Sequence, residues 1–161
     1  MKKLKIIATG GTIDKVYFDD KSEYQIGDPI ISEILRNMNV AFDYDVLPLM
    51  KKDSLYINDD DRALIRKLVE KAPETHFLIT HGTDTMVETA RYLLGLPGKT
   101  IVLTGALTPA RFRETDAIFN IGCALGAVQC LDEGAWVVMN GVVWDPRAVT
   151  KNRSAGRFEA I

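Results

Sequence analysis

The sequence has few of the residues that build metal sites and disulfides, with two cysteines and two histidines in 161 residues. Cys123 and Cys130 lie in a segment that we predict to be helical, where their spacing puts the Cα atoms about 10 Å apart. This separation exceeds disulfide reach, so we expect both to be reduced core residues. His76 and His81 have no cysteine or acidic cluster at ligand spacing beside them. We therefore expect no metal site.

A strong charge of one sign and long apolar runs are also missing. The formal net charge is −2, which provides no basic surface for nucleic acid or an anionic membrane. No apolar run reaches the roughly 18 to 20 residues that a membrane helix needs, and the run within "MKKLKIIATGG" is too short for a signal-peptide core. We expect a cytoplasmic protein without nucleic-acid or membrane partners.

The residues that are present indicate one globular domain over residues 1–161, since 47% are hydrophobic and 26% are charged. Apolar runs alternate with segments of helical periodicity. The expected strands are "LKIIATG" (4–10), "AFDYDVLPLM" (41–50), "HFLITHG" (76–82), "KTIVLTGA" (99–106) and "AWVVMNGVVW" (135–144). The expected helices are 30–37, 59–73, 86–94 and 114–131.

This alternation predicts an α/β fold. Runs that are apolar throughout indicate strands buried on both faces, as in a parallel sheet. Helical crossovers between them predict a three-layer, doubly wound, mostly parallel sheet of the flavodoxin or Rossmann type. Asn140-Gly141 lies between two apolar runs and predicts a closing antiparallel hairpin. The polar segment 15–29 predicts a loop long enough to act as a lid.

The stretch "ATGGTID" (8–14) places two glycines directly before Thr12. A dinucleotide fingerprint requires G-x-G-x-x-G leading into a helix, and a P-loop requires G-K-[ST]; neither is present, so we expect no nucleotide cofactor. Taken alone, Thr12 fits a turn in which its hydroxyl bonds the backbone. The alternative is that the glycines let a substrate approach and leave the Thr12 hydroxyl uncovered.

A second Gly-Thr turn, "THGTDT" (80–85), follows the third expected strand. In a sheet of order 2-1-3-4-5, the first and third strands are neighbours at the topological switch point, where ligands bind. Thr12 and Thr83 would then face each other. Helix capping is the alternative role for Thr83 and Asp84. However, the segment Thr85 to Glu88 fits a capping box unaided, so Thr83 and Asp84 are not needed as caps, although Asp84 could share that role. This favours a chemical role for the two residues.

A threonine nucleophile needs a base within hydrogen-bond reach. The available candidates are Lys151, in the segment "AVTKNRS", and Tyr24 or Tyr17, in the expected lid. Composition and spacing do not choose among these three.

These segments resemble the bacterial-type L-asparaginases, also called the asparaginase/glutaminase family. "ATGGTI" and "ITHGTDTMVETA" are similar to the two signature segments of that family. The similarity continues through "KSEYQIG", "DSLYI", "TGALTP" and "VVMNGVVWDPRAVTKN", and thus covers essentially the whole chain. The resemblance implies hydrolysis of the side-chain amide of L-asparagine to aspartate and ammonia, with L-glutamine as a second candidate substrate.

The resemblance also implies site residues. Thr12 would be the nucleophile with Tyr24 as its partner, while Thr83, Asp84 and Lys151 would form a second catalytic group. Residues implied to bind or line the substrate are Gly11, Asp53, Ser54, Gly82, Thr83, Asp84 and Ala106. Among these, Ser54 and Asp84 would hold the α-carboxylate and α-amino groups.

Two features depart from the family. Members usually have a second, C-terminal domain that contributes an acidic residue to a neighbouring subunit's site, and this sequence ends at "NRSAGRFEAI". We expect either a short single-domain member or a fragment, and a homo-oligomer that completes the pocket. Asp14 stands where the family generally has a small residue. It is expected to be a solvated loop acid or a negative charge near the substrate ammonium.

Two other functions remain as alternatives. The chain could be the amidase part of a tRNA-dependent amidotransferase, or an asparagine- or aspartate-binding domain with little turnover. Its near-neutral charge argues against a tRNA surface. Retention of Thr12, Tyr24, Thr83, Asp84 and Lys151 argues against simple binding, which needs no activated hydroxyl. A nucleotide-binding flavodoxin-like protein would need the missing phosphate loop.

Overall fold

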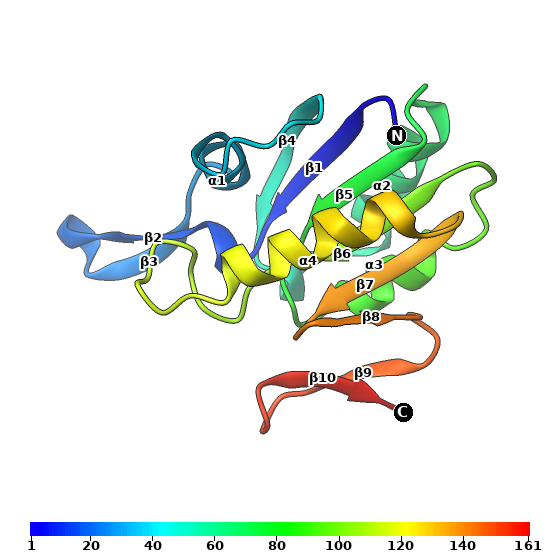
Figure 1. Ribbon diagram of the computed structural model, residues 1–161. Coiled ribbons are helices and arrows are strands. Elements are labelled where there is room, and N and C mark those ends of the chain that lie inside the picture. Colours follow the sequence, from blue (N-terminus) through cyan, green and yellow to red (C-terminus); the bar gives the residue numbers. More distant parts are fainter.

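A six-stranded sheet in the order β4-β1-β5-β6-β7-β8 forms the centre of the protein, in a computed structural model that describes residues 1–161 (Figure 1). Its strands are β1 (Leu4–Gly10), β4 (Tyr44–Lys52), β5 (His76–Thr80), β6 (Thr100–Thr104), β7 (Gly134–Met139) and β8 (Val142–Trp144). All pair in parallel except β7 and β8, which are antiparallel. The predicted strand order and closing hairpin are confirmed. At that turn, Asn140 and Gly141 both have positive φ, as a two-residue hairpin requires.

Helices cover both faces of the sheet, as the alternating pattern predicts. They are α1 (Ile31–Asn37), α2 (Asp59–Lys71), α3 (Met86–Tyr92) and α4 (Ala117–Cys130). Helix α2 begins with a capping box between Asn58 and Asp61, which satisfies free amides of its first turn. None of the helices combines the length and apolarity needed to span a membrane.

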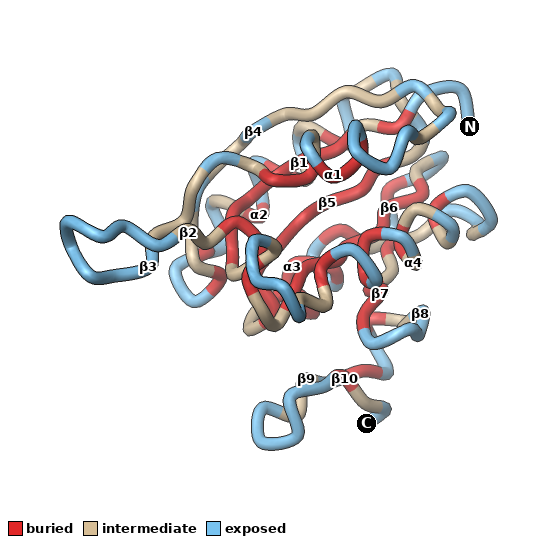
Figure 2. Tube along the Cα trace, turned by 60° about the vertical axis from the view of Figure 1, so that its left-hand side comes forward, coloured by how far each residue is buried: buried red, intermediate tan, exposed pale blue.

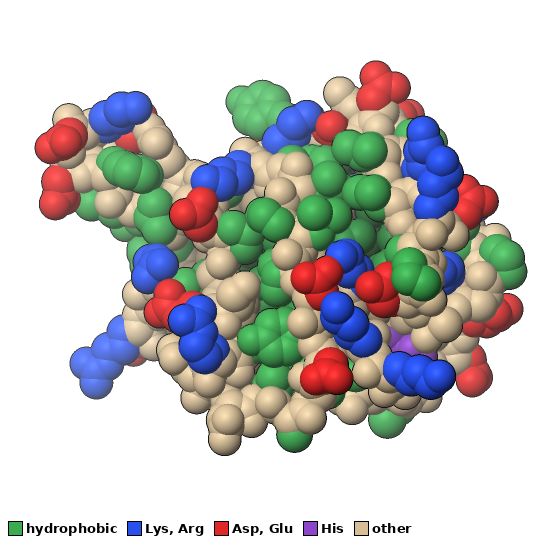
Figure 3. Space-filling model, turned by 90° about the horizontal axis from the view of Figure 1, so that it is seen from above, with side chains coloured by type: hydrophobic (Ala, Val, Ile, Leu, Met, Phe, Trp, Pro, Cys, Tyr) green, Lys and Arg blue, Asp and Glu red, His purple; other side chains and the backbone are tan.

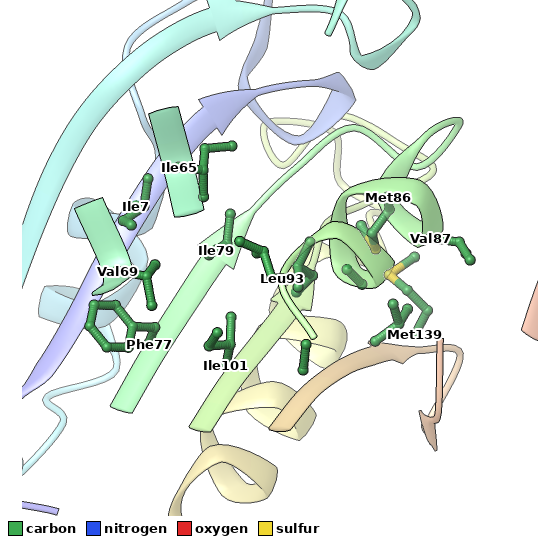
Figure 4. Packing of buried hydrophobic residues seen from close by; sticks show 14 of the residues in the cluster. Ile7, Ile65, Val69, Phe77, Ile79, Met86, Val87, Leu93, Ile101 and Met139 are labelled. Carbon is green, nitrogen blue, oxygen red and sulfur yellow. The ribbon is translucent and has the colours of Figure 1, made fainter. Parts of the chain in front are cut away.

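Alternate residues of each central strand pack on opposite faces of the sheet. Phe77 and Ile79 of β5 belong to one core cluster, together with residues of α2 and α3 (Figure 4). Leu78, between them, belongs to the other cluster with residues of α1 and α4. Strand β4 lies at the edge and is only half-buried, which explains how it accommodates Pro48.

Two hairpins lie outside the central sheet. The first consists of β2 (Lys15–Phe18) and β3 (Glu23–Ile26), and it projects away from the body (Figures 1 and 2). The prediction of an irregular loop over 15–29 was therefore wrong. Within β2 and β3 themselves, most residues are aromatic or β-branched, which favours strands. The rings of Tyr17 and Tyr24 pack across the two strands with their centroids 5.2 Å apart.

The second hairpin, β9 (Val149–Asn152) and β10 (Arg157–Ala160), was not predicted. It lies below β8 in Figure 1 and contributes Val149 and Phe158 to the core cluster of α2 and α3. The two cysteines are free, as expected. The expectation that both lie in the core was wrong for Cys130, which is exposed as the last residue of α4, while Cys123 is half-buried.

Charged side chains of both signs are interspersed on the face seen in Figure 3, around a central group of hydrophobic side chains. This face therefore presents no extended field of one sign, in keeping with the net charge of −2.

Candidate active site

Thr12 begins a short 3₁₀ turn directly after β1. Its side chain is half-buried and makes no hydrogen bond within the protein, so the expected alternative of a hydroxyl bonded to its own backbone does not hold. The turn is fixed by the backbone, since Gly11 N–H donates to Lys52 O at 2.9 Å and Ala110 N–H donates to Ile13 O at 3.1 Å. The structure thus presents an uncommitted hydroxyl on a rigid turn.

The two Gly-Thr turns are in direct contact. Gly11 has φ 85°, and a Cβ there would lie 2.5 Å from the Cα of Gly82. A Cβ on Gly82 would in turn lie 2.7 Å from Ser54 Oγ. Three of the predicted site segments therefore meet at one point, and glycine is required there because the protein's own chain approaches so closely.

A hydrogen-bonded group of three side chains lies on the second turn. Lys151 Nζ donates to Thr83 Oγ1 at 2.7 Å and to Asp84 Oδ1 at 2.8 Å. Thr83 is 6% exposed, and the Lys151 side chain is 15% exposed. Arg153 Nε lies 3.6 Å from the same Asp84 oxygen. The fold thus brings Lys151 to a threonine and an aspartate that precede it by more than 60 positions in the sequence.

Lys151 reaches this group because its hairpin is docked on the core. In β9 it follows Val149, which is 0% exposed, and it lies opposite Phe158, which is 3% exposed. Asn140 Oδ1 in the β7–β8 turn accepts the Phe158 N–H at 2.8 Å. The buried apolar residues and this hydrogen bond together hold Lys151 against Thr83 and Asp84, in the turn that follows β5.

Beneath Thr83, the buried His81 supports the turn. Its Nδ1 lies 2.7 Å from Gly82 O and its Nε2 lies 2.8 Å from Thr89 Oγ1. Burial lowers the pKa of His81 to about 4, so the ring is neutral at pH 7. A neutral ring must donate from Nδ1 to the carbonyl and accept at Nε2 from the threonine. Arg62 Nε continues the network by donating to Thr89 at 3.1 Å.

The loop after β6 carries the predicted pocket residue Ala106, which is 1% exposed. Asp116 holds this loop by accepting the N–H groups of Leu107, at 2.9 Å, and Thr108, at 3.0 Å. Asn120 Nδ2 donates to Gly105 O at 3.0 Å. Sequence reasoning missed Asp116 and Asn120. No sequence signal marked them, because both fall inside the predicted helix 114–131, whereas α4 begins only after Asp116.

Asp53 and Ser54 both accept hydrogen bonds from backbone N–H groups of the protein. The Asp53 carboxylate accepts the Leu55 N–H at 3.0 Å and lies 4.0 Å from Lys15 Nζ. Ser54 is 1% exposed, and its Oγ accepts the Thr85 N–H at 3.3 Å. Thr85 Oγ1 donates to Ser54 O at 2.7 Å and forms no cap, so the expected capping box at α3 is wrong. The tertiary contact with Ser54 takes the hydroxyl that the box would use.

Tyr24 is not brought to Thr12. It lies in β3 on the projecting hairpin, is 50% exposed, and its ring packs against Tyr17 and Phe112. Its hydroxyl makes no hydrogen bond within the protein. Tyr17, the other tyrosine candidate, is equally exposed, at 51%.

Asp14 is not a solvated loop acid, since it is 4% exposed. Its Oδ1 accepts the Ile30 N–H at 2.9 Å, while its Oδ2 is buried without a partner. Burial raises its pKa to about 6, because the charged form loses its hydration.

A cavity of about 450 Å³ opens beside the lysine group, between α3 and the β9–β10 hairpin. Asp84, Lys151 and Arg153 contribute to its wall, but Thr12 and Thr83 do not. Gly11 and Gly82, where the two turns touch, likewise do not line this cavity.

Comparison with protein families places these residues in a known context. Residues 3–160 match the family model described as "Asparaginase, N-terminal". The chain is 31% identical over 171 residues to L-asparaginase 2 of Escherichia coli, covering 96% of this chain and 47% of the relative. It is 32% identical over 164 residues to a probable periplasmic L-asparaginase of Haemophilus influenzae, covering 94% and 46%. The chain spans about half the length of the curated relatives it matches.

Solved structures agree on the fold. The thermostable L-asparaginase from Thermococcus kodakarensis superposes with a TM-score of 0.84 at 25% identity, covering 99% of this chain and 51% of that one. L-asparaginase I from Vibrio cholerae superposes with a TM-score of 0.81 at 20% identity and supports the fold alone. The family resemblance of the sequence motifs and the expected fold are both confirmed.

Proposed function

This chain belongs to the asparaginase family through its N-terminal domain, and from that premise we propose that it hydrolyses the side-chain amide of L-asparagine. The observation that carries the proposal is the hydrogen-bonded group of Thr83, Asp84 and Lys151, set on a turn that contacts the Thr12 turn. A lysine held against a threonine hydroxyl beside an uncommitted threonine fits acyl transfer better than simple binding.

In the proposed first half-reaction, Thr12 Oγ attacks the amide carbon and loses its proton to a base. The carbonyl oxygen becomes an oxyanion, for which the backbone N–H groups of the Gly-Thr turns are suited. Collapse of this intermediate breaks the carbon–nitrogen bond. The leaving nitrogen takes up a proton and departs as ammonia, which leaves an ester on Thr12.

The lysine group suits the proton transfers. Because Thr83 Oγ1 accepts a hydrogen bond from Lys151 Nζ, its own proton is free to be donated to a reacting atom. Lys151 can replace that proton, and Asp84 stabilises the ammonium. In the second half-reaction, water adds to the ester carbon, Thr12 regains its proton and aspartate leaves.

Unused hydrogen-bonding capacity in two side chains supports the proposed substrate-binding roles. Asp84 Oδ2 makes no hydrogen bond in the protein and is available to the α-ammonium, while Oδ1 stays with Lys151. Ser54 donates no hydrogen bond and is proposed to donate to the α-carboxylate. The role of Tyr24 requires its hairpin to bring the hydroxyl within hydrogen-bond distance of Thr12. L-glutamine is one carbon longer and is the natural comparison substrate.

Ammonia release from L-asparagine and L-glutamine by the purified 161-residue chain tests this function. Thr12→Val removes the hydroxyl at nearly constant shape, and Thr12→Ser restores a hydroxyl as the matched variant. We expect turnover in the wild type, loss to background in Thr12→Val and partial recovery in Thr12→Ser. Absence of wild-type turnover together with measurable binding of aspartate would reject the amidohydrolase and support a binding domain.

Self-association belongs to the same proposal, because the cavity beside Asp84 and Lys151 opens at the surface and a neighbouring subunit would exclude water from it. Sedimentation at micromolar concentration measures it, and a monomer there would contradict it. A cytoplasmic location also stays a prediction, and one relative is named as periplasmic.

A further inference from the structure

The carboxyl of Asp14 has the least expected environment of any acid in the protein. It lies two residues after Thr12 and is 4% exposed, yet one of its oxygens has no hydrogen-bond partner. A buried carboxylate with an unpartnered oxygen costs free energy, so this position is not explained as a favourable surface charge. A local contact must hold the side chain in place.

That contact lies at the root of the β2–β3 hairpin. Asp14 Oδ1 accepts the Ile30 N–H at 2.9 Å, and Asp14 O accepts the Gly27 N–H at 2.8 Å. The first pair of the hairpin ladder, Lys15 with Ile26, follows directly. One residue thus binds the returning chain at two points, through its carbonyl and its carboxyl.

Beyond this root, little holds the hairpin to the body. Strands β2 and β3 pair only with each other, and residues 17–24 are exposed (Figure 2). The ring of Tyr24 contacts Phe112, which is itself 42% exposed. The position of the hairpin relative to Thr12 is therefore set mainly at its root.

We propose that Asp14 is a positioning residue, whose buried carboxyl fixes the root of the Tyr24 hairpin to the turn that carries Thr12. The outer part of the hairpin can then change position while its root stays in place. Tyr24 remains connected to Thr12 by a short segment of chain whose near end is fixed. A short tether raises the effective concentration of one group at the other. The consequence for Tyr24 rests on the proposed function; the fixed root does not.

Limited proteolysis with trypsin tests the root without any assay of activity. Lys21 lies in the exposed turn of the hairpin and serves as an internal reference, while cleavage after Lys15 requires the root to open. In Asp14→Ala we expect cleavage after Lys15 to rise at least about tenfold relative to cleavage after Lys21. Asp14→Asn keeps an acceptor for Ile30 N–H and should stay close to the wild type.

Asp28→Ala is the matched control, because it removes an acid from the same segment whose side chain is 91% exposed and pairs only with Lys51. It should leave the Lys15 to Lys21 cleavage ratio unchanged. An Asp14→Ala ratio equal to that of the wild type would overturn the proposal. So would an equal increase in Asp28→Ala, since the effect would then be one of charge.

A double-mutant cycle tests whether the root acts through Tyr24. Asp14→Ala should lower kcat about tenfold, and Asp14→Asn should recover most of that loss. In a Tyr24→Phe background, Asp14→Ala should cause little further loss. Independent, multiplicative losses would reject action through Tyr24. If the wild type has no amidohydrolase activity, the proposed function fails while the proteolysis result still decides the fixed root.

Discussion

The two hairpins outside the central sheet each carry one residue of the proposed mechanism, and they are held in opposite ways. The β9–β10 hairpin buries Val149 and Phe158 and places Lys151 against Thr83 and Asp84. The β2–β3 hairpin buries no residue, and Tyr24 is half exposed and 5.7 Å in ring separation from Phe112. One hairpin is docked and the other is attached by its root.

This contrast divides the candidate site into a preformed half and a movable half. A side chain is held precisely when its element buries apolar area and makes additional hydrogen bonds, as β9 does. An element with few buried contacts can change position at low cost, which suits a lid that admits substrate. Substitutions in the docked hairpin, in the projecting hairpin and at its root test this contrast.

Lys151→Met has the largest expected effect. The methionine preserves the apolar stem but removes the donor to Thr83 and Asp84, so kcat for asparagine should fall by about a hundredfold to ten-thousandfold. Steady-state ammonia release measures the change. Arg153→Gln alters the neighbouring, more exposed cation and should cost less than about tenfold. Similar losses in both variants would contradict the special role of Lys151.

Phe158→Ala weakens the packing of the β9–β10 hairpin on the core and leaves Thr83, Asp84 and Lys151 unchanged. It removes a ring that is 3% exposed, and the free energy of unfolding should fall by about 3 to 4 kcal/mol. Urea unfolding measures this, and kcat should fall with it because Lys151 loses its support. Phe18→Ala, at a ring that is 42% exposed in the other hairpin, should cost less than about 1 kcal/mol. Equal losses of unfolding free energy in Phe158→Ala and Phe18→Ala would show that the two hairpins are held equally strongly, contrary to this description.

Asp14→Asn sharpens the description of the projecting hairpin through the pH dependence of stability. The pKa of Asp14 is raised in the folded protein from 3.8 to about 6. The protonated Asp14 side chain is tolerated in the folded protein, so its contribution to stability is fully present below the unfolded pKa of 3.8. That contribution is lost as the pH rises through about 6, because the buried side chain then becomes charged. Removing the group should raise the free energy of unfolding more at neutral than at acid pH.

The expected difference between Asp14→Asn and the wild type changes by about 2 kcal/mol between about pH 4.5 and about pH 7.5. Urea unfolding of both proteins at the two pH values measures it. His81 acts in the opposite direction, because its lowered pKa makes acid destabilising. The wild type alone therefore shows a partly cancelled effect, and only the difference isolates Asp14. A pH-independent difference would mean that Asp14 titrates normally.

Tyr24→Phe has the smallest expected effect on the free energy of unfolding. It should lower kcat by about tenfold to a hundredfold, because only the hydroxyl that reaches Thr12 in the closed state is lost. The free energy of unfolding should change by less than about 0.5 kcal/mol, since the ring is half exposed and its hydroxyl is unbonded. Unaltered kcat would remove Tyr24 from the mechanism. Tyr17→Phe, at its cross-strand neighbour, is the control.

The layers of the fold were predictable because their pattern is local. Ile65 and Val69 show helical spacing in α2, and Asn140-Gly141 permits only a tight turn, so both elements were found. The β2–β3 hairpin was missed because its strands are only four residues long, are separated by polar residues and bury no side chain, which leaves little hydrophobic periodicity to detect. The capping box at Thr85 was wrongly predicted because Ser54, 31 residues away, takes the hydroxyl.

The sequence alone determined the family, the order of the strands and the presence of two Gly-Thr turns. Each of these depends on motifs or on hydrophobic periodicity, which involve residues close together in the chain. The tertiary structure alone decided that Gly11 touches Gly82, that Lys151 bonds Thr83 and that Asp14 is buried. These contacts join residues from 16 to 71 positions apart. Their geometry depends on how the elements pack, and burial, which sets the charge state of Asp14, exists only after packing.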